Sequence, residues 1–310
     1  MPNSITVFSP ATVANVACGF DILGLALDLP GDTITLHRSD APGIRITRIT
    51  GAEGLPTDPA QNVCGVAIQA LLDALGSTQG FELELEKGIP PGSGIGSSAA
   101  SAAGAVFAAN ELLGGPFRRA DLVPFAMEGE KLVSGVAHAD NVAPALLGGF
   151  VLVRSYAPLD LVPIATPERL CCAVIHPHIE VKTADARRIL RRDISLAAAI
   201  RQWGNVGGLV AGLLTNDLDL VGRSLEDVVV EPVRSILIPG YEEVKTAALA
   251  SGALGCSISG SGPSIFALCD GIESARHVRD IIAQTYRELG LEFKVYASPV
   301  NRAGVRIVEP

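Results

Sequence analysis

The sequence has no excess of positive charge, and this narrows the functions open to it. Its 310 residues include 24 Lys and Arg against 33 Asp and Glu, which gives a formal net charge of −9. No basic stripe is visible, so the charge pattern argues against nucleic acid as a partner. It does not argue against a small anion such as ATP, because local dipoles and magnesium bind such a ligand.

Signals for metal binding, disulfides, secretion and membrane insertion are also missing. The six cysteines are scattered through apolar surroundings without metal-ligand spacing, which is typical of buried thiols in a reducing cytosol. The N-terminus lacks a basic stretch followed by an apolar one, so we see no secretion signal there. Apolar runs such as residues 143–153 are broken by Pro144 and Gly148 and are too short to span a bilayer. We therefore expect a cytoplasmic protein without a membrane partner.

The length and composition are those of an ordinary folded protein and not of a disordered one. Hydrophobic residues make up 48% and charged residues 18%, and such a chain can bury a sizeable core in one large or two medium domains. Strand and helix patterns are mixed in both halves, which predicts an α+β fold with two lobes. We place the lobes at residues 1–155 and 156–310. The proline-containing segment 156–169 is interpreted as the crossing between them.

Local patterns predict the main elements. Strands are expected at residues 5–8, 32–37, 43–50, 81–86, 149–154, 170–175 and 293–297, with a further pair around 260–263. Helices are expected at residues 62–75, 97–113, 120–133, 183–192, 195–214, 241–251 and 273–289. The segment 9–15 between the first strand and the apolar stretch 20–29 is predicted to be a loop.

The most informative segment is the glycine- and serine-rich run at residues 89–101. It follows a half-buried strand and leads into an alanine-rich helix that Gly114-Gly115 closes. Unpaired N–H groups and the positive end of the helix dipole make such a place an anion site, and glycines let the backbone approach a phosphate closely. We predict that this run binds a nucleotide. The predicted contacts are Pro91, Gly92, Ser93, Gly94, Ile95, Gly96, Ser97, Ser98, Ala99, Ala100 and Ser101.

This run differs from two familiar phosphate loops. A Walker A loop has a lysine after its last glycine, and this run contains none. A dinucleotide fingerprint needs an acidic residue at the end of the next strand, whereas Glu111 falls inside the predicted helix. Lys87, at the end of the preceding strand, is predicted to reach a phosphate or the base, although a solvated lysine is the equal alternative.

Three segments in order resemble the GHMP small-molecule kinases. They lie at residues 9–27, 89–101 and 255–264. Within that family the sequences around Phe20-Asp21, His138 and Pro239-Gly240 resemble the homoserine kinases most. Where these kinases usually have Gly-Pro-Gly before Phe-Asp, this chain has Ala17-Cys18-Gly19, so we expect a rebuilt turn with Asn15 and Asp21 still in register.

The resemblance implies a two-lobed GHMP kinase fold with the active site in the cleft between the lobes. It implies ATP-dependent phosphorylation of the side-chain hydroxyl of L-homoserine to O-phospho-L-homoserine, a step toward threonine, with Mg²⁺; a homodimer would be in keeping with it. One rival is another GHMP kinase with a mevalonate-type acceptor, against which an ammonium partner at Asp21 would argue. The second is a non-catalytic sensor of ATP or an amino acid, which would tend to lose its phosphate or metal ligands.

The resemblance also assigns roles to polar residues. Asp21 would bind the substrate ammonium, and Arg187 and Arg234 its carboxylate, with Arg187 also near the transferring phosphoryl group. Polar contacts with the substrate are expected from Asn15, His138 and Thr183. For Asp21 a turn-capping role, and for Arg187 an exposed helix face, are the alternatives.

On the nucleotide side, Ser98 and Glu130 match the metal positions of the family, with Glu128 as a rival to Glu130. Asn62 is expected to contact the adenine or ribose. Two catalytic mechanisms remain open: Asp140 abstracts the hydroxyl proton, or no protein base acts and Asn141 orients the hydroxyl while its proton passes to the γ-phosphate. We favour the second.

Overall fold

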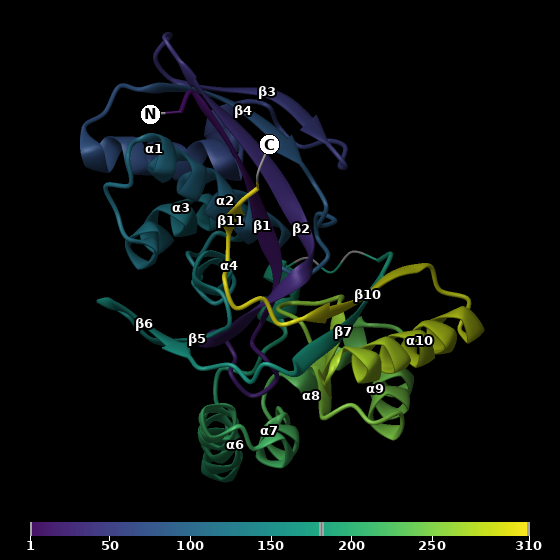
Figure 1. Ribbon diagram of the computed structural model, residues 1–310. Helices are drawn as coiled ribbons and strands as arrows, with labels where there is room; N and C mark the ends of the chain where they lie inside the picture. Colours follow the sequence, from purple (N-terminus) through teal and green to yellow (C-terminus); the bar gives the residue numbers. More distant parts are fainter. Residues whose placement is uncertain (1, 180, 182, 309–310) are drawn as a thin grey trace.

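The computed structural model describes residues 2–179, 181 and 183–308, apart from the side chains of residues 134, 183 and 184. It contains two β-sheets with helices packed on each (Figure 1). This mixture of sheets and helices confirms the predicted α+β fold. No helix within these residues is both long and apolar enough to cross a membrane.

The first sheet has seven strands in the order β11-β1-β2-β4-β3, with β5 and β6 attached beside β2. Its strands are β1 (Ser4–Ala14), β2 (Leu23–Ser39), β3 (Ile44–Thr50), β4 (Gly80–Glu86), β5 (Phe150–Tyr156), β6 (Leu159–Ile164) and β11 (Arg306–Ile307). One face carries α1 (Val63–Leu75), α2 (Ser97–Leu112), α3 (Val123–Ser134) and α4 (Val142–Leu147). The last strand, β11, thus returns the end of the chain to the sheet that the first strand began.

Helix α2 is the centre of this half of the molecule. It packs on β1 and β2 and is covered by α1 and α3, so 14 of its 16 residues are buried. Its alanines and glycine make this close packing possible: a Cβ at Gly104 would come within 2.5 Å of the Ile34 Cδ1 atom. A helix that is buried on every side holds its N-terminus rigidly in place.

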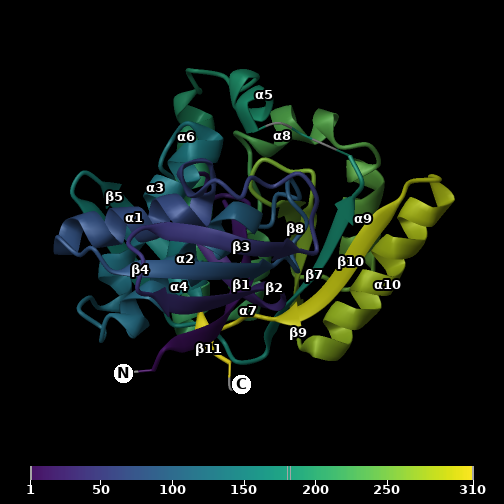
Figure 2. The same ribbon diagram turned by 90° about the horizontal axis from the view of Figure 1, so that it is seen from above.

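The second sheet has four antiparallel strands in the order β10-β7-β9-β8. They are β7 (Leu170–Pro177), β8 (Gly255–Ile258), β9 (Ile265–Asp270) and β10 (Phe293–Pro299). Helices α9 (Tyr241–Ala250) and α10 (Ile272–Glu288) cover one face (Figure 2). The remaining helices are α5 (Thr183–Arg188), α6 (Leu196–Thr215), α7 (Leu218–Ser224) and α8 (Glu231–Arg234). A shared core that includes Leu25, Val174 and Leu213 joins the two halves.

Two local predictions are wrong. The segment 9–15 is not a loop, because β1 continues to Ala14, with a register shift against β2 between Pro10 and Thr12. The segment 156–169 is not simply a crossing, since β6 within it pairs with β5 as a hairpin. In both places prolines suggested a loop, whereas an edge position or a bulge lets a strand accommodate proline. The division at residues 155 and 156 stays a prediction.

Candidate active site

The glycine-serine loop connects β4 to α2 and adopts a conformation that depends on its glycines. Gly92, Gly94 and Gly96 have φ values of 71°, 80° and 68°, a region that other residues rarely enter. Gly96 is the N-cap of α2 and supplies no side-chain hydrogen bond to the helix N-terminus. A Cβ there would lie 2.0 Å from the Thr12 Oγ1 atom. The free N–H groups of the first turn of α2 are therefore the anion-binding feature that the sequence predicted.

A buried ion pair fixes the base of this loop. The Lys87 ammonium lies 2.5 Å from Asp32 Oδ2, and both side chains are almost fully buried. The ammonium also donates to the Ser97 carbonyl and to the Ser101 hydroxyl, while Asp32 Oδ1 accepts from the N–H groups of residues 88 and 89. These bonds give all three N–H groups of Lys87 an acceptor within the protein. A direct contact between Lys87 and the nucleotide stays a prediction, and the geometry favours an indirect role.

The third segment that carries the family resemblance, residues 255–264, packs against the glycine-serine loop. The Ser259 hydroxyl donates to the Gly94 carbonyl at 2.8 Å, and the Ser264 hydroxyl donates to the Ser93 carbonyl at 2.6 Å. A Cβ on Gly94 would come within 2.5 Å of the Gly262 carbonyl oxygen. Backbone from the second half of the chain thus closes one side of the loop.

The loop opens into a cavity of about 290 Å³ that lies between residues of both halves. Of the predicted nucleotide contacts, those that line it are Asn62, Lys87, Pro91, Gly92, Gly94, Gly96, Ser97, Ser98 and Ser101. The side chains of Ser93, Ile95, Ala99 and Ala100 are instead buried in the protein interior. Any contact that these four make with a nucleotide would come from their backbone.

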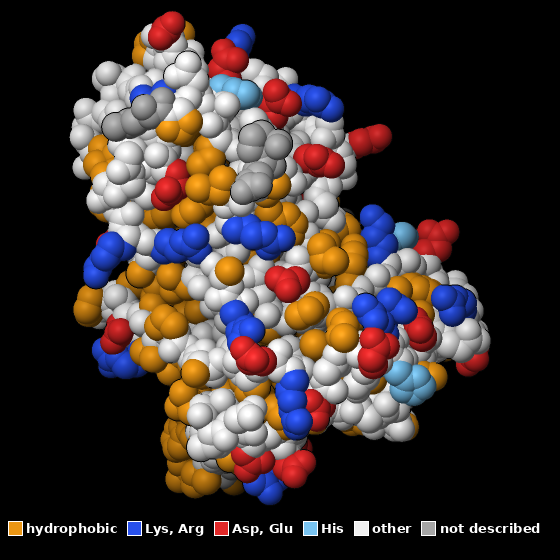
Figure 3. All heavy atoms as spheres, in the orientation of Figure 1, with side chains coloured by type: hydrophobic (Ala, Val, Ile, Leu, Met, Phe, Trp, Pro, Cys, Tyr) orange, Lys and Arg blue, Asp and Glu red, His pale blue; other side chains and the backbone are white. Residues whose placement is uncertain are grey.

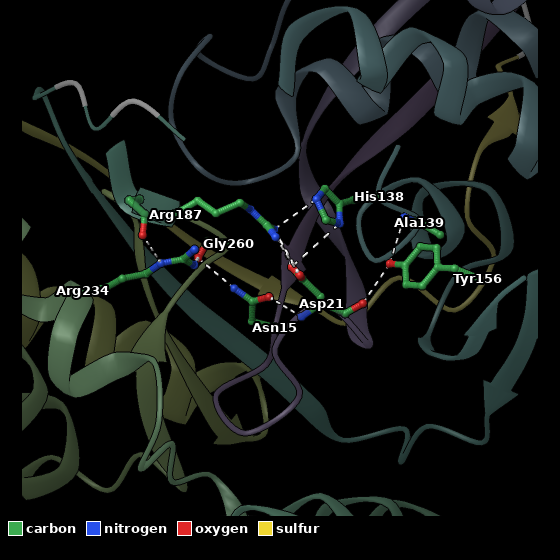
Figure 4. A network of polar contacts seen from close by, with 9 residues as sticks. Asn15, Asp21, His138, Ala139, Tyr156, Arg187, Arg234 and Gly260 are labelled. Carbon is green, nitrogen blue, oxygen red and sulfur yellow. Dashed lines mark hydrogen bonds and ion pairs between the residues drawn. The ribbon is translucent and has the colours of Figure 1, made fainter. Parts of the chain in front are cut away.

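A charged cluster lies in the same cavity (Figure 4). The Arg187 guanidinium donates to both carboxylate oxygens of Asp21, at 2.9 and 3.1 Å, and lies 3.0 Å from His138 Nε2. The predicted cation and anion sites for the substrate are therefore paired with each other. Burial is the main cause that lowers the pKa of His138; the charge of Asp21 opposes this shift, and the charges of Arg187 and Arg234 add to it. The imidazole is consequently neutral at pH 7.

The second predicted arginine, Arg234, is held from three sides. Its guanidinium donates to the carbonyls of Ala186 and Gly260 and lies over the Phe20 ring, 5.0 Å from the centroid. Burial, followed by the nearby charge of Arg187, lowers its pKa to about 10, so it remains charged at pH 7. The buried guanidinium of Arg234 and the half-buried one of Arg187 together form a strong site for a carboxylate.

The segment that carries Asn15 and Asp21 has a left-handed backbone at several residues. Asn15, Val16, Ala17 and Asp21 have φ values of 70°, 44°, 59° and 61°. The Asn15 amide donates to the Gly260 carbonyl at 2.8 Å, and its Oδ1 atom accepts from the Asp21 N–H at 3.0 Å. The departure at Ala17-Cys18 thus coexists with a direct bond between Asn15 and Asp21.

Asp140 and Asn141 precede α4 at the cavity wall. The Asn141 Oδ1 atom accepts from the Thr12 hydroxyl at 2.7 Å. The amide NH₂ group of Asn141 is therefore the end of the side chain that can donate to a ligand. Asp140 is 4% exposed. Burial, with smaller effects from the charges of Asp21 and Glu130, raises its pKa to about 7.

The residues predicted to bind magnesium lie together. Ser98 lies in the first turn of α2 and Glu130 belongs to α3, and both line the cavity. Burial raises the pKa of Glu130, whereas a hydrogen bond from Ser98 and the charge of Lys87 lower it. A hydroxyl and a carboxylate beside a phosphate loop are the hard oxygen ligands that Mg²⁺ takes together with substrate phosphates, so the donor set fits the ion. Glu128, the rival to Glu130, pairs with Lys131 on the half-exposed side of α3.

Of the two remaining predicted contacts, Asn62 has a structural role of its own. The Asn62 side chain caps α1 by accepting from the Cys64 N–H at 2.9 Å and donates to the Pro56 carbonyl. Its contact with adenine or ribose stays a prediction. Thr183 begins α5, and its side chain lies outside the described residues.

Three residues of the site had no assigned role in the sequence. Thr12 orients Asn141, and Phe20 lies beneath both Arg187 and Arg234. The Tyr156 hydroxyl donates to the Asp21 carbonyl at 2.8 Å and accepts from the Ala139 N–H. Phe20 could have been noticed from its place beside Asp21. Nothing near Tyr156 in the sequence indicates its contact, because the two partners are 135 residues apart.

Known proteins match this chain along its length. The sequence models for the GHMP kinases N terminal domain and the GHMP kinases C terminal region match residues 62–149 and 209–288. A homoserine kinase of Chloroherpeton thalassium is 52% identical, with 98% of this chain and 99% of that protein covered. The crystal structure of a homoserine kinase from Cytophaga hutchinsonii is 56% identical and superposes with a TM-score of 0.96, covering 99% and 98% of the two chains.

A more distant structure shows the fold alone. Mevalonate kinase of L. major superposes with a TM-score of 0.68 at 20% identity, covering 94% of this chain and 95% of that one. The full-length matches at about half identity, together with the glycine-serine loop and the charged cluster in one cavity, place the chain in a single branch of the fold. It belongs to the GHMP kinase family and, within it, to the homoserine kinases.

Proposed function

We propose that this chain transfers the γ-phosphoryl group of ATP to the side-chain hydroxyl of L-homoserine and forms O-phospho-L-homoserine for threonine biosynthesis. The observation that carries the proposal is the cluster of Asp21, Arg187 and Arg234 in the cavity onto which the glycine-serine loop opens. A zwitterion with a hydroxyl needs one anion and a pair of cations, and these three residues supply them. A mevalonate-type acceptor has no ammonium group for Asp21.

Substrate binding would exchange one ion pair for two. Arg187 and Asp21 neutralise each other before a ligand arrives. The ammonium group of homoserine would take its place at Asp21, while the substrate carboxylate would bind the released Arg187 together with Arg234. Because both partners of the original pair gain a new counter-charge from the substrate, the carboxylate of Asp21 would not be left unpaired in a half-buried site. Asn15, His138 and Thr183 would add polar contacts.

The nucleotide would lie along the loop with its phosphates at the N-terminus of α2. Glycine N–H groups and the dipole of α2 would bind the β- and γ-phosphates. Ser98 and Glu130 would hold Mg²⁺, which supplies neutralisation of phosphate charge when bound. Asn62, which lines the cavity, would contact the adenine or ribose, and Lys87 would keep the loop in shape through Asp32.

For the proton, we favour a mechanism without a protein base. The amide oxygen of Asn141 already accepts from Thr12, so its NH₂ group would donate to the homoserine hydroxyl and aim a lone pair at the γ-phosphorus. The hydroxyl proton would pass to a γ-phosphate oxygen, as a loose transition state allows. The alternative base is Asp140, whose pKa of about 7 is suited to proton transfer.

We place the two lobes at residues 1–155 and 156–310, and the enzyme in the cytoplasm. The cellular location agrees with the cysteines, since all six are unpaired by disulfides and buried.

The deciding experiment measures ADP release with ATP, Mg²⁺ and L-homoserine. Mevalonate, L-threonine, L-serine and no acceptor are run in parallel. We expect homoserine-dependent release that collapses in Asp21→Ala and persists in Asp40→Ala, a control at an exposed aspartate. Release with another acceptor would overturn the substrate, and ATP binding without turnover on any acceptor would favour the sensor.

A further inference from the structure

Helix α6 carries a glutamine on the face that it buries. Its outer face is apolar, with Ile200 and Trp203 58% and 64% exposed, and Figure 3 shows hydrophobic side chains at the lower left, where Figure 1 places α6. Gln202 lies on the inner face and is only 8% exposed. A buried amide costs free energy unless its polar atoms find partners. The partners of Gln202 therefore show what this residue does.

The amide group of Gln202 joins two segments that are far apart in the sequence. Its Nε2 atom donates to the Cys18 carbonyl and to Asp227 Oδ1, at 2.9 Å in each case. Its Oε1 atom accepts from the Val228 N–H at 3.0 Å. Cys18 belongs to the segment that ends at Asp21, and the other two partners precede α8. Both hydrogens of the amide are thus used, one on each segment.

Asp227 continues this connection into α8. Its carboxylate accepts from the N–H groups of residues 229, 230 and 231, at 2.8–3.0 Å. It therefore satisfies donors at the start of α8 that have no partner within the helix. Helix α8 has only four residues and ends at Arg234, which lines the cavity. A shift at the start of so short a helix changes the position of Arg234 directly.

A second connection joins the same two segments at the cavity wall. The Gly260 carbonyl accepts from the Asn15 amide at 2.8 Å and from the Arg234 guanidinium at 3.0 Å. Gly260 lines the cavity, whereas Gln202 and Asp227 are not among the described residues that line it. The segments are therefore joined once at the cavity and once in the interior. Two separate attachments fix both the distance and the direction between them, which a single attachment leaves free.

The contact to Cys18 also follows directly on strained backbone. Val16 and Ala17 have φ values of 44° and 59°. Residues with side chains keep such values only where surrounding contacts hold them. The Gln202 amide bonds to the next carbonyl along the chain. Removal of this bond is therefore expected to loosen the backbone that carries Asp21.

We propose that Gln202 and Asp227 are positioning residues, which together set the separation between the ammonium site and the carboxylate site. The first site is Asp21, and the second is Arg234 with Arg187; these assignments rest on the proposed function. In an α-amino acid the ammonium and carboxylate groups are attached to one carbon atom. The substrate can use both sites only when they are held at a matching separation, and a misplacement of about 1 Å can reduce a rate by about 100-fold.

The first test compares the kinetics of Gln202→Met with those of the wild type. Methionine keeps the approximate size of the side chain and removes both donors. We expect kcat/KM for L-homoserine to fall by about 10- to 100-fold, mainly through a higher KM, and the KM for ATP to change by less than about 2-fold. A role limited to folding would not separate the two KM values in this way.

Asn205→Leu is the matched control for this test. Asn205 lies on the same helix and donates to the Glu226 carbonyl at 2.8 Å. Its described hydrogen bond thus reaches the segment before α8 and not residues 15–21. We expect both KM values to stay within about 2-fold of those of the wild type.

A double-mutant cycle tests whether Gln202 and Asp227 act through one connection. Asp227→Asn replaces a carboxylate oxygen by an NH₂ group, which cannot accept from the N–H groups of α8. It should raise the KM for homoserine as Gln202→Met does. The variant with both changes should lose no more kcat/KM than the more damaging single change, because either change already breaks the connection. Losses that multiply would show two independent effects and overturn the proposal.

Hydrogen exchange measures the connection without any ligand. Gln202→Met should speed amide exchange at residues 15–23 and 228–234 together, whereas Asn205→Leu should leave residues 15–23 unchanged. This measurement does not depend on the reaction. Faster exchange in both segments, with no homoserine-dependent ADP release from the wild type, would support the connection and overturn the proposed function.

Two further results would overturn the proposal. The first is unchanged exchange at residues 15–23 in Gln202→Met, with the variant shown to be folded by circular dichroism. The second is an equal rise in the KM values for ATP and homoserine. If Gln202→Met does not fold, Asp227→Asn provides the same two readouts from the other end of the connection.

Discussion

The two loops that meet in the active-site cavity both contain left-handed backbone, but with different residue types. The glycine-serine loop reaches left-handed backbone conformations with glycines at 92, 94 and 96. The segment from Asn15 to Asp21, which we call the substrate loop, reaches them with four residues that have side chains. A left-handed conformation costs such residues roughly 1–2 kcal/mol each, and glycine almost nothing.

The difference shows what holds each loop in place. The glycine-serine loop reaches its shape at little conformational cost. It is positioned by the buried Lys87–Asp32 pair and by the hydroxyl groups of Ser259 and Ser264. The substrate loop depends on distant partners that outweigh its strain: Asn15 bonds to Gly260, and the carbonyl of Asp21 accepts from Tyr156. Strain maintained by surrounding contacts is typical of sites whose side chains need fixed directions. The four changes below test this comparison, from the largest expected effect to the smallest.

Replacing Lys87 by methionine should destabilise the protein by removing the ion pair beneath the glycine-serine loop. The change leaves the Asp32 carboxylate buried without its ammonium partner, so we expect the free energy of unfolding to fall by about 3–5 kcal/mol. Urea denaturation at pH 7 measures it. Lys131→Met, at an exposed pair with Glu128, should cost less than about 1 kcal/mol. Equal losses in the two variants would show that the buried pair has no special role.

Replacing Asp140 by asparagine should stabilise the protein at neutral pH. Its native pKa of about 7 lies above the unfolded value of about 3.9, so the native state binds more protons between these values. Wild-type stability contributed by this group therefore falls as pH rises from about 4 to 7, by up to about 4 kcal/mol.

The asparagine variant lacks this dependence, and its stability relative to wild type should increase over the same pH window. Urea denaturation at pH 4.5 and pH 7.5 checks the sign. In the same variant appreciable turnover is expected, because the mechanism that we propose has Asn141 orient the hydroxyl without a protein base. A drop of several decades in kcat at unchanged KM would assign the base to Asp140.

Replacing Asp21 by asparagine should weaken the binding of homoserine and leave the binding of ATP unchanged. The ammonium group loses its counter-charge, for which we expect a fall of about 100-fold in kcat/KM for homoserine, or about 2.7 kcal/mol. The KM for ATP should change less than about 2-fold. Asp185→Asn, at the exposed partner of Arg188, is the matched control. If the KM for ATP rose as much as that for homoserine, the two loops would not bind separate ligands.

Replacing Ala17 by glycine should slightly stabilise the substrate loop. Ala17 has a φ of 59°, and glycine removes that strain while adding flexibility to the unfolded chain, which leaves a gain of about 0.5 kcal/mol. Thermal unfolding followed by calorimetry can resolve it. The same change at Ala105, inside α2, should instead destabilise the protein by about 1 kcal/mol. A loss of stability at Ala17 would mean that the loop is not strained.

Much of the architecture could be predicted because local patterns carried it. Helix α1 begins at Val63 after its Asn62 cap and ends at Leu75, as the apolar spacing predicted, and α2 and α10 lie within a residue of their predicted bounds. The prediction was wrong where tertiary pairing overrode a local signal, as at Pro10 in β1 and in the hairpin of β5 and β6. The helices α4, α7 and α8 were not predicted, because they are only 4–7 residues long and such short segments carry little periodicity.

For the site, the sequence by itself determined the parts that are contiguous. Glycine spacing, a following helix and a serine at its start are local properties, and local sterics convert them into an anion site wherever they occur. Only the tertiary structure decided that Arg187 pairs with Asp21 across 166 positions and that Lys87 faces inward to Asp32. The reason is that a charge finds its partner through space rather than along the chain, and burial decides which pair is the stronger.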